Sequence, residues 1–256
     1  MAIRRGAFRI WLAAFLSGCA FAQTLGIYTE TQTPWQYEGA DGTPAGPSVA
    51  VVKEIQRRVG NSDPIHMVPW ARAYAMIQGQ PNVVLFLMTR TAERNGLFQW
   101  VGPIGEGVYG LSVKAGSSIV LRSLDEAKKL ERVGVYRGDV RDQLLTEKGF
   151  TNLERVTDNE MNARKLMAGR IDAFASSDVT IASTVKAAGF DPSEVRLALP
   201  FFRYQTWIAF SKQTSPDFVK AWADTLEDMR RERVLERIIR KEIPTWTPPG
   251  PPITSF

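Results

Sequence analysis

Two arginines and two threonines stand where an apolar run ends. The run NVVLFL passes into MTRTAERNGLFQW at residues 88–100, which contains Thr89, Arg90, Thr91 and Arg94. A guanidinium group is planar and gives a carboxylate two parallel, charge-assisted hydrogen bonds, which a lysine does not match. Ligands of open α/β sheets bind outside the carboxyl ends of the strands. The stretch is therefore a candidate ligand-binding segment at the end of a buried strand.

Strands and helices alternate before this segment. Residues 25–29, 64–70 and 82–88 read as strands, and residues 48–60 and 70–79 have the apolar spacing of helices. A second alternation of the same kind follows a glycine-rich stretch. The pattern predicts an α/β fold in which helices cover parallel strands.

The sequence predicts two lobes that are joined twice. The chain crosses near residues 105–110 and returns near residues 203–207. Two crossings, rather than one linker, indicate a hinge with a ligand cleft between the lobes. The expected segments are residues 23–107 and 205–247 for lobe 1, residues 108–204 for lobe 2, and a proline-rich tail at residues 248–256.

One long helix is expected after the second crossing. Ser215 and Pro216 make a good helix start, and the helical pattern continues to Ile243. The tail PTWTPPGPPITSF cannot continue a helix, so we expect it to be loose or packed by Trp246 alone.

Composition excludes several classes of function. The net charge is +5, but Arg4, Arg5 and Arg9 lie at the N-terminus, and without them the charge is +2, which disfavours nucleic-acid binding. His66 is the only histidine and Cys19 the only cysteine. Most zinc sites, a disulfide and a catalytic thiol are therefore not expected, nor is a Ser-His-Asp triad unless His66 serves. We expect no cofactor.

The N-terminus has the build of a secretory signal peptide over residues 1–22. A basic start is followed by an apolar stretch and by Ala20-Phe21-Ala22, which predicts cleavage before Gln23. An alternative is that Leu16-Ser17-Gly18-Cys19 is a lipobox, which would make Cys19 a lipidated N-terminus. Both interpretations predict export to the periplasm.

Three motifs in order resemble those of bacterial periplasmic solute-binding proteins of family 3, the amino-acid-binding type. They are MTRTAERNGLFQWVGPI, RVGVYRGD and LMAGRIDAFASSD, and the resemblance covers about residues 24–243. The resemblance implies a two-lobed, periplasmic-binding-protein-like fold of type II. It also implies a monomer that captures an amino acid or small carboxylate for the membrane permease of an ABC-type importer, without catalysis.

The resemblance assigns roles to individual residues. Arg94 matches the arginine that holds the ligand's α-carboxylate, and Thr89 matches a donor beside it. Glu30 falls near an acidic position that receives the ligand's ammonium group, and Trp35 falls at an aromatic that covers the ligand's side chain. Asp139 opens the lobe 2 helix whose N-terminal amides would meet an anion.

Two features depart from the family pattern, and two further residues complete the candidate site. Asp139 stands where a threonine or serine is usual, so it would repel a carboxylate or serve simply as a helix N-cap. Ser177 stands at the position of the ammonium-binding acid, and Asp178 follows one residue late, where only a bulge would let it serve. Trp70 is expected to flank the ligand or to pack in the core, and Arg72 to reach the cleft or pair with an acid.

Two other functions remain open at this stage. The same fold could be a periplasmic enzyme similar to cyclohexadienyl dehydratases, with Glu30, Asp139 or Asp178 as a general acid or base. It could also be a sensor input that reports to a membrane kinase. Turnover of a candidate acid would favour the enzyme, and neighbouring genes would separate a permease partner from a kinase partner.

Overall fold

The structure, a computed structural model, describes residues 24–253. The expected signal peptide, its cleavage before Gln23, the alternative lipobox at Cys19 and the last three residues of the tail lie outside these residues. Within residues 24–253, no helix is both long and apolar enough to cross a membrane.

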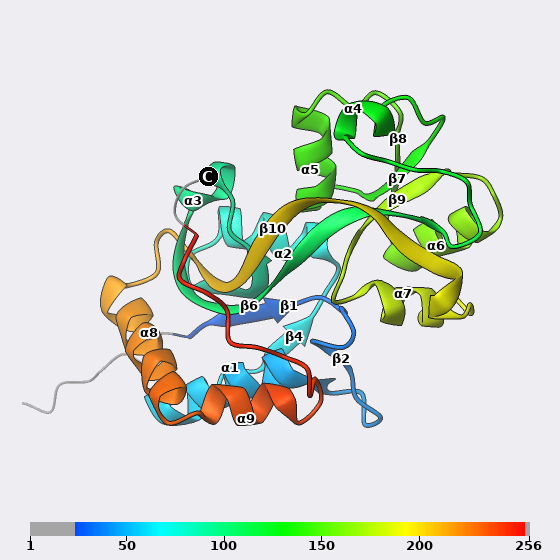
Figure 1. Ribbon diagram of the computed structural model, residues 1–256. Coiled ribbons are helices and arrows are strands. Elements are labelled where there is room, and N and C mark those ends of the chain that lie inside the picture. Colours follow the sequence, from blue (N-terminus) through cyan, green and yellow to red (C-terminus); the bar gives the residue numbers. More distant parts are fainter. Residues whose placement is uncertain (1–23, 254–256) are drawn as a thin grey trace, which may run out of the picture.

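Lobe 1 is built on parallel strands in the order β4-β1-β5 (Figure 1). Every residue of β5 is buried, as expected for a strand covered on both faces. This confirms the strand–helix alternation expected for the first hundred residues. The main elements are β1 (Gly26–Thr29), α1 (Pro47–Val59), β4 (Ile65–Met67), α2 (Trp70–Gly79) and β5 (Val83–Thr89).

Lobe 2 repeats this plan with strands in the order β9-β7-β8, of which β7 is parallel to both neighbours. Its core consists of aliphatic residues and phenylalanines from these strands, from the helices between them and from the neighbouring chain segments. The elements are α4 (Leu124–Ala127), β7 (Val133–Tyr136), α5 (Val140–Glu147), β8 (Leu153–Val156), α6 (Asn159–Met167), β9 (Ala173–Ser177), α7 (Ile181–Ala187) and a 3-10 turn at Pro192–Glu194.

Two long antiparallel strands join the lobes. β6 (Phe98–Lys114) and β10 (Val195–Ser211) have 17 residues each and pair along almost their whole length. β10 also pairs with β5 of lobe 1, and β6 pairs with β9 of lobe 2, so one eight-stranded sheet runs through both lobes. The two expected crossings are thus the middles of two neighbouring strands, which Figure 1 shows as the ribbons between the lobes.

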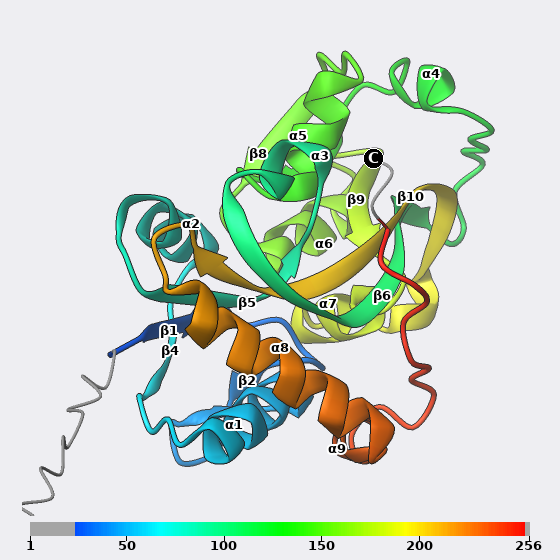
Figure 2. The same ribbon diagram turned by 90° about the vertical axis from the view of Figure 1, so that its left-hand side faces the viewer.

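The C-terminal helices complete lobe 1 beside α1 (Figure 2). The prediction of one continuous helix is wrong, because α8 (Pro216–Arg231) stops before α9 (Val234–Arg240) begins. Arg233 adopts a left-handed conformation with φ of 56°, which no helix can include. Leu235 and Ile239 of α9 are buried in the same core as Trp222 of α8, so the break lets a second apolar face turn onto the core.

The remaining described elements are short. They are β2 (Tyr37–Glu38), β3 (Pro44–Ala45) and α3 (Ala92–Asn95).

Candidate functional site

Two cavities lie between the lobes. A large cavity of about 370 Å³ opens beside the β1 end, and an inner cavity of about 20 Å³ lies deeper, beside α3 and β6. Glu30 and Gln32, which follow β1, line both cavities. The two cavities therefore meet at the carboxyl end of a parallel strand, where the fold places ligands.

The structure brings six of the nine candidate residues to the inner cavity. These are Glu30, Trp35, Trp70, Thr89, Arg94 and Asp139. They come from both lobes and are far apart in the sequence. Their convergence is a consequence of the sheet, which lines up the carboxyl ends of β1, β5 and β7.

Arg94 is the most deeply buried charged residue of the site, with 1% of its surface exposed. Its guanidinium carbon lies 5.1 Å from the ring centres of both Trp70 and Tyr74, a cation–π arrangement. One guanidinium nitrogen donates to the Thr89 carbonyl (3.4 Å) and the other to Gln143 Oε1 (2.8 Å). Within the described residues, its buried Nε has no hydrogen-bond partner. The cation is held in place but keeps donor capacity for an anion.

Local sequence explains the position of Arg94. Thr91 caps α3, and its hydroxyl accepts a hydrogen bond from the Arg94 backbone amide (3.3 Å). The turn of helix that follows β5 then directs the side chain back to the end of that strand. The Thr-x-x-Arg spacing is therefore what aims the guanidinium at the cavity.

Stacked tyrosines form the wall opposite. The hydroxyls of Thr89 and Tyr109 lie 2.8 Å apart, and the rings of Tyr109 and Tyr204 stack at 4.0 Å. The Tyr204 hydroxyl lies 2.6 Å from the Ser177 hydroxyl. Burial raises the pKa of both tyrosines, so both hydroxyls stay protonated at neutral pH and can donate hydrogen bonds.

Asp139 is both the N-cap of α5 and half of an ion pair. Its carboxylate accepts hydrogen bonds from the backbone amide of Arg141 (2.9 Å) and from the Arg141 guanidinium. The Arg141 side chain is 5% exposed, and it lies over the Tyr109 ring at 5.4 Å. Arg141 neutralises the aspartate that departs from the family pattern, so Asp139 does not present an unpaired negative charge to the cavity.

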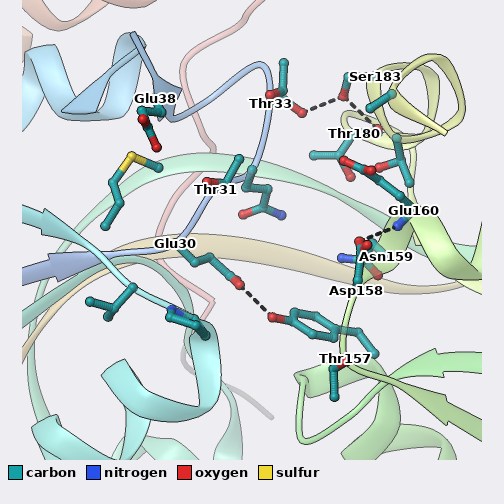
Figure 3. Close-up of a pocket in the computed structure, with 17 residues that line it drawn as sticks. Glu30, Thr31, Thr33, Glu38, Thr157, Asp158, Asn159, Glu160, Thr180 and Ser183 are labelled. Atoms are coloured by element: carbon teal, nitrogen blue, oxygen red, sulfur yellow. Dashed lines mark hydrogen bonds between the residues drawn. The ribbon is translucent and has the colours of Figure 1, made fainter. Parts of the chain in front are cut away.

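Glu30 faces Tyr136 across the cleft (Figure 3), and its Oε2 accepts a hydrogen bond from the Tyr136 hydroxyl (3.1 Å). Burial, and next the negative charge of Asp139, raise the pKa of the Glu30 carboxyl from 4.5 to about 8. The hydrogen bond from Tyr136 and the positive charge of Arg141 act in the opposite direction but do not cancel this rise. Glu30 is therefore largely protonated at neutral pH in this conformation.

Direct hydrogen bonds hold the lobes together around the site. The Trp70 indole donates to the Gly138 carbonyl (3.1 Å), and the Ser183 hydroxyl donates to the Thr33 carbonyl (2.5 Å). Together with the bond between Arg94 and Gln143, these contacts define a closed arrangement. The inner cavity holds little more than one water molecule, so a larger ligand needs the lobes to open.

The lining of the large cavity is polar and acidic. Figure 3 shows side chains from both lobes around it. None of its lining residues is a lysine, arginine or histidine, whereas four are acids: Glu30, Glu38, Asp158 and Glu160. Arg164 pairs with the last two from outside the lining. The cavity thus favours hydroxyl, amide or cationic groups on a ligand.

Three candidate residues line neither cavity. Arg72 is exposed on α2. Ser177 is buried and touches the site only through Tyr204, as described above. Asp178 is exposed, and its carboxylate accepts a hydrogen bond from the Val108 amide (2.9 Å). Asp178 therefore secures the β6 crossing, and no bulge turns it into the cavity.

Sequence reasoning missed several residues of the inner cavity and its surroundings. They are Glu106, Tyr109, Arg141, Tyr204 and Thr206. Most lie in the middle of the long strands, where aromatic and polar residues are hard to tell from ordinary strand residues. The stretch GDVRD did contain a signal, because an arginine two residues after an N-cap aspartate can fold back onto it.

The described residues contain no group of three or more histidine, cysteine, aspartate or glutamate side chains placed to hold a metal ion. The site is instead one of paired charges, hydroxyls and aromatic rings.

The sequence model of one protein family, the bacterial extracellular solute-binding proteins of family 3, matches residues 25–245. The chain belongs to this family. The resemblance noted in the sequence is confirmed, and so is the two-lobed fold. The search of curated proteins gave no match.

Solved structures share the fold at low identity. A histidine kinase sensor domain similar to periplasmic binding proteins has a TM-score of 0.80 and 16% identity, covering 89% of this chain and 98% of its own. An ancestral arginine-binding protein bound to arginine has a TM-score of 0.74 and 21% identity, covering 85% and 97%. AncCDT-1, an ancestral amino-acid-binding protein and precursor of cyclohexadienyl dehydratase, has a TM-score of 0.71 and 16% identity. The match covers 85% of this chain and 94% of AncCDT-1. At such identities the likeness concerns the fold alone.

Proposed function

We propose that this protein binds a small carboxylate of the amino-acid type in the periplasm and delivers it to the permease of an ABC-type importer. The observation that carries the proposal is Arg94, a buried guanidinium beside two stacked aromatic rings, whose Nε has no partner among the described residues. A buried cation is costly unless an anion or strong acceptors compensate it. A ligand carboxylate supplies that compensation, with hydroxyls of Thr89 and Tyr109 beside it.

The large cavity receives the rest of the ligand. A carboxylate at Arg94 directs the body of the molecule past Glu30, because Glu30 lines both cavities. Beyond Glu30 the lining holds no lysine, arginine or histidine, and Arg164 pairs with Asp158 and Glu160 but not with Glu38, so the charge of Glu38 favours a positively charged far end. We therefore expect basic amino acids to bind more tightly than acidic ones. The arginine-bound ancestral protein shows that this fold can hold a basic amino acid.

A thermal-shift screen tests the proposal. The panel contains basic, neutral and acidic amino acids and simple carboxylates without an amino group. A ligand that binds only the folded state raises the melting temperature by mass action. Arg94→Ala is expected to abolish the shift, whereas Arg72→Ala, which replaces an exposed arginine outside both cavities, is expected to keep it. An equal shift in the Arg94→Ala variant would refute the carboxylate clamp.

A second candidate function is supported by Glu30. A carboxyl group that stays protonated near neutral pH in a closed cleft can act as a general acid, as a dehydratase requires. The fold of the dehydratase precursor AncCDT-1 is compatible with this alternative. Incubation with cyclohexadienyl acids, followed by their ultraviolet absorbance, distinguishes the two functions. Turnover that Glu30→Gln abolishes would favour the enzyme, and binding without turnover would favour the transporter component.

A further inference from the structure

The C-terminal tail is attached to one buried side chain. The Gln205 amide nitrogen donates to the carbonyls of Gly250 (3.1 Å) and Pro251 (3.0 Å), and its oxygen accepts from the Ile253 amide (2.9 Å). Gln205 is 3% exposed with the tail in place, and the tail supplies the partners that its buried amide needs. The expectation of a loose tail packed by Trp246 alone is wrong for residues 250–253.

The attachment point is the strand crossing itself. Gln205 of β10 is paired directly with Glu106 of β6. Glu106 Oε2 accepts a hydrogen bond from the Gly250 amide (3.0 Å), and Glu106 also lines the inner cavity. The tail thus binds both strands at the point where they pass from one lobe to the other. Figures 1 and 2 show it, in red, running from α9 to the β6–β10 ribbon.

The other end of the tail is fixed to lobe 1. Trp246 is 7% exposed within the lobe 1 core, and its carbonyl accepts a hydrogen bond from Arg240 of α9 (2.9 Å). Four prolines, at positions 248, 249, 251 and 252, stiffen the chain between the two attachments. Proline-rich segments are extended and lose little conformational entropy on docking. The segment between the two attachments is therefore stiff, so its two ends keep a nearly fixed separation.

We propose that residues 248–253 are a strap that holds the β6–β10 crossing in the closed arrangement and keeps Glu106 in the wall of the inner cavity. Gln205 and Glu106 stay paired with each other, so the movement that matters is that of the crossing relative to the lobe 1 anchor at Trp246, which a rotation of the backbone at the crossing would change. The strap's hydrogen bonds therefore favour the closed state, which is the differential contact that a shift in population needs. The strap acts on the closure that the proposed function uses, but it does not depend on which ligand is bound.

The test measures the distance between the lobes without any ligand. Spin labels are placed at two exposed positions, Lys53→Cys in α1 and Met161→Cys in α6, in a chain with Cys19 replaced by serine. Pulsed electron spin resonance then compares the full chain with chains that end at residue 247 or at residue 253. We expect one short distance for the full chain and for the chain ending at 253. The chain ending at 247 should give a longer and broader distribution.

A point variant tests the same proposal in a chain of full length, in case the truncated chain does not fold. Gln205→Leu keeps the side chain's volume and removes its three hydrogen bonds to the tail, so it should also lengthen the distance. Identical distributions in the full and strap-less chains, even with a lower melting temperature, would overturn the proposal, because the tail would then only stabilise lobe 1. This result would leave the Arg94-dependent thermal shift unaffected. The two experiments therefore test the strap and the proposed function independently.

Discussion

Arg94 contributes shape as well as charge to the inner cavity. Its planar group lies beside the stacked rings of Trp70 and Tyr74, 5.1 Å from each ring centre. Arg94→Lys keeps the charge but loses the bidentate geometry and the stacking. We expect the affinity for a carboxylate ligand to fall by about 10- to 100-fold, the size of one charge-assisted hydrogen bond. Titration calorimetry measures the change, and Arg72→Lys is the matched control; equal losses in both variants would count against a clamp.

Glu30 makes stability depend on pH. Its pKa is 4.5 before burial and about 8 in the folded protein, so the folded state retains a proton that the unfolded state releases. The free energy of unfolding should therefore decrease as the pH rises from 4.5 to about 8. Glu30→Gln removes this contribution and should flatten the dependence.

The measurement is the melting temperature at about pH 5 and about pH 8. Between these two pH values, the melting temperature of the wild-type protein should fall by more than that of the Glu30→Gln variant. The variant Glu147→Gln, at an exposed position, should behave like the wild type. Parallel curves for all three proteins would mean that Glu30 is ionised in the folded state.

Some residues of the site could be predicted from the sequence, because their place depends only on the neighbouring strand or helix. Arg94, Thr89 and Asp139 lie directly after strands or at helix starts, where the order of elements alone fixes their place. Ser177 and Asp178 could not be settled, because one residue at the end of a strand reverses the direction of a side chain. The ion pair with Arg141 depends on a side-chain conformation, which no spacing rule specifies.

Glycines in β6 let the two crossing strands approach closely. A Cβ atom on Gly110 would lie 2.7 Å from the Leu199 carbonyl oxygen of β10, a backbone atom that cannot move aside. Gly110→Ala should therefore lower the free energy of unfolding by about 1–3 kcal/mol, as overpacking does elsewhere. Gly116→Ala is the control, because its Cβ would meet nothing within 4 Å. Urea unfolding of both variants measures the difference; equal stabilities would show that β6 and β10 can separate without cost.

At the scale of elements, periodicity predicted the core strands and helices but not the breaks. The apolar run of β5 and the spacing in α1 are strong signals, because burial depends on them directly. The break at Arg233 carries no such signal, since an arginine rarely adopts a left-handed conformation. The length of β6 and β10 was also not foreseen, because glycines and aromatic residues near the crossings resemble loops.

At the scale of the whole molecule, the proposed signal peptide predicts where the protein is found. If residues 1–22 are a signal peptide, expression of the complete gene in a Gram-negative host should place the protein in the periplasm with Gln23 as its first residue. Mass spectrometry of the intact protein distinguishes this from a chain that begins at a lipidated Cys19. Cys19→Ser should leave a protein cleaved before Gln23 unchanged and should abolish lipidation; a mass that includes Met1 would contradict both forms of export.

The continuous sheet also sets an order of assembly. β5 pairs with β10 from Thr89 opposite Thr206 to Val84 opposite Phe210, so lobe 1 lacks a central strand until the last fifth of the chain is available. Trp222, which fills the lobe 1 core, comes later still. Such non-local pairing is slow because a long loop must close first. A chain threaded through a secretion channel from its N-terminus would therefore remain unfolded in lobe 1 for most of its passage, and would complete that lobe only on arrival.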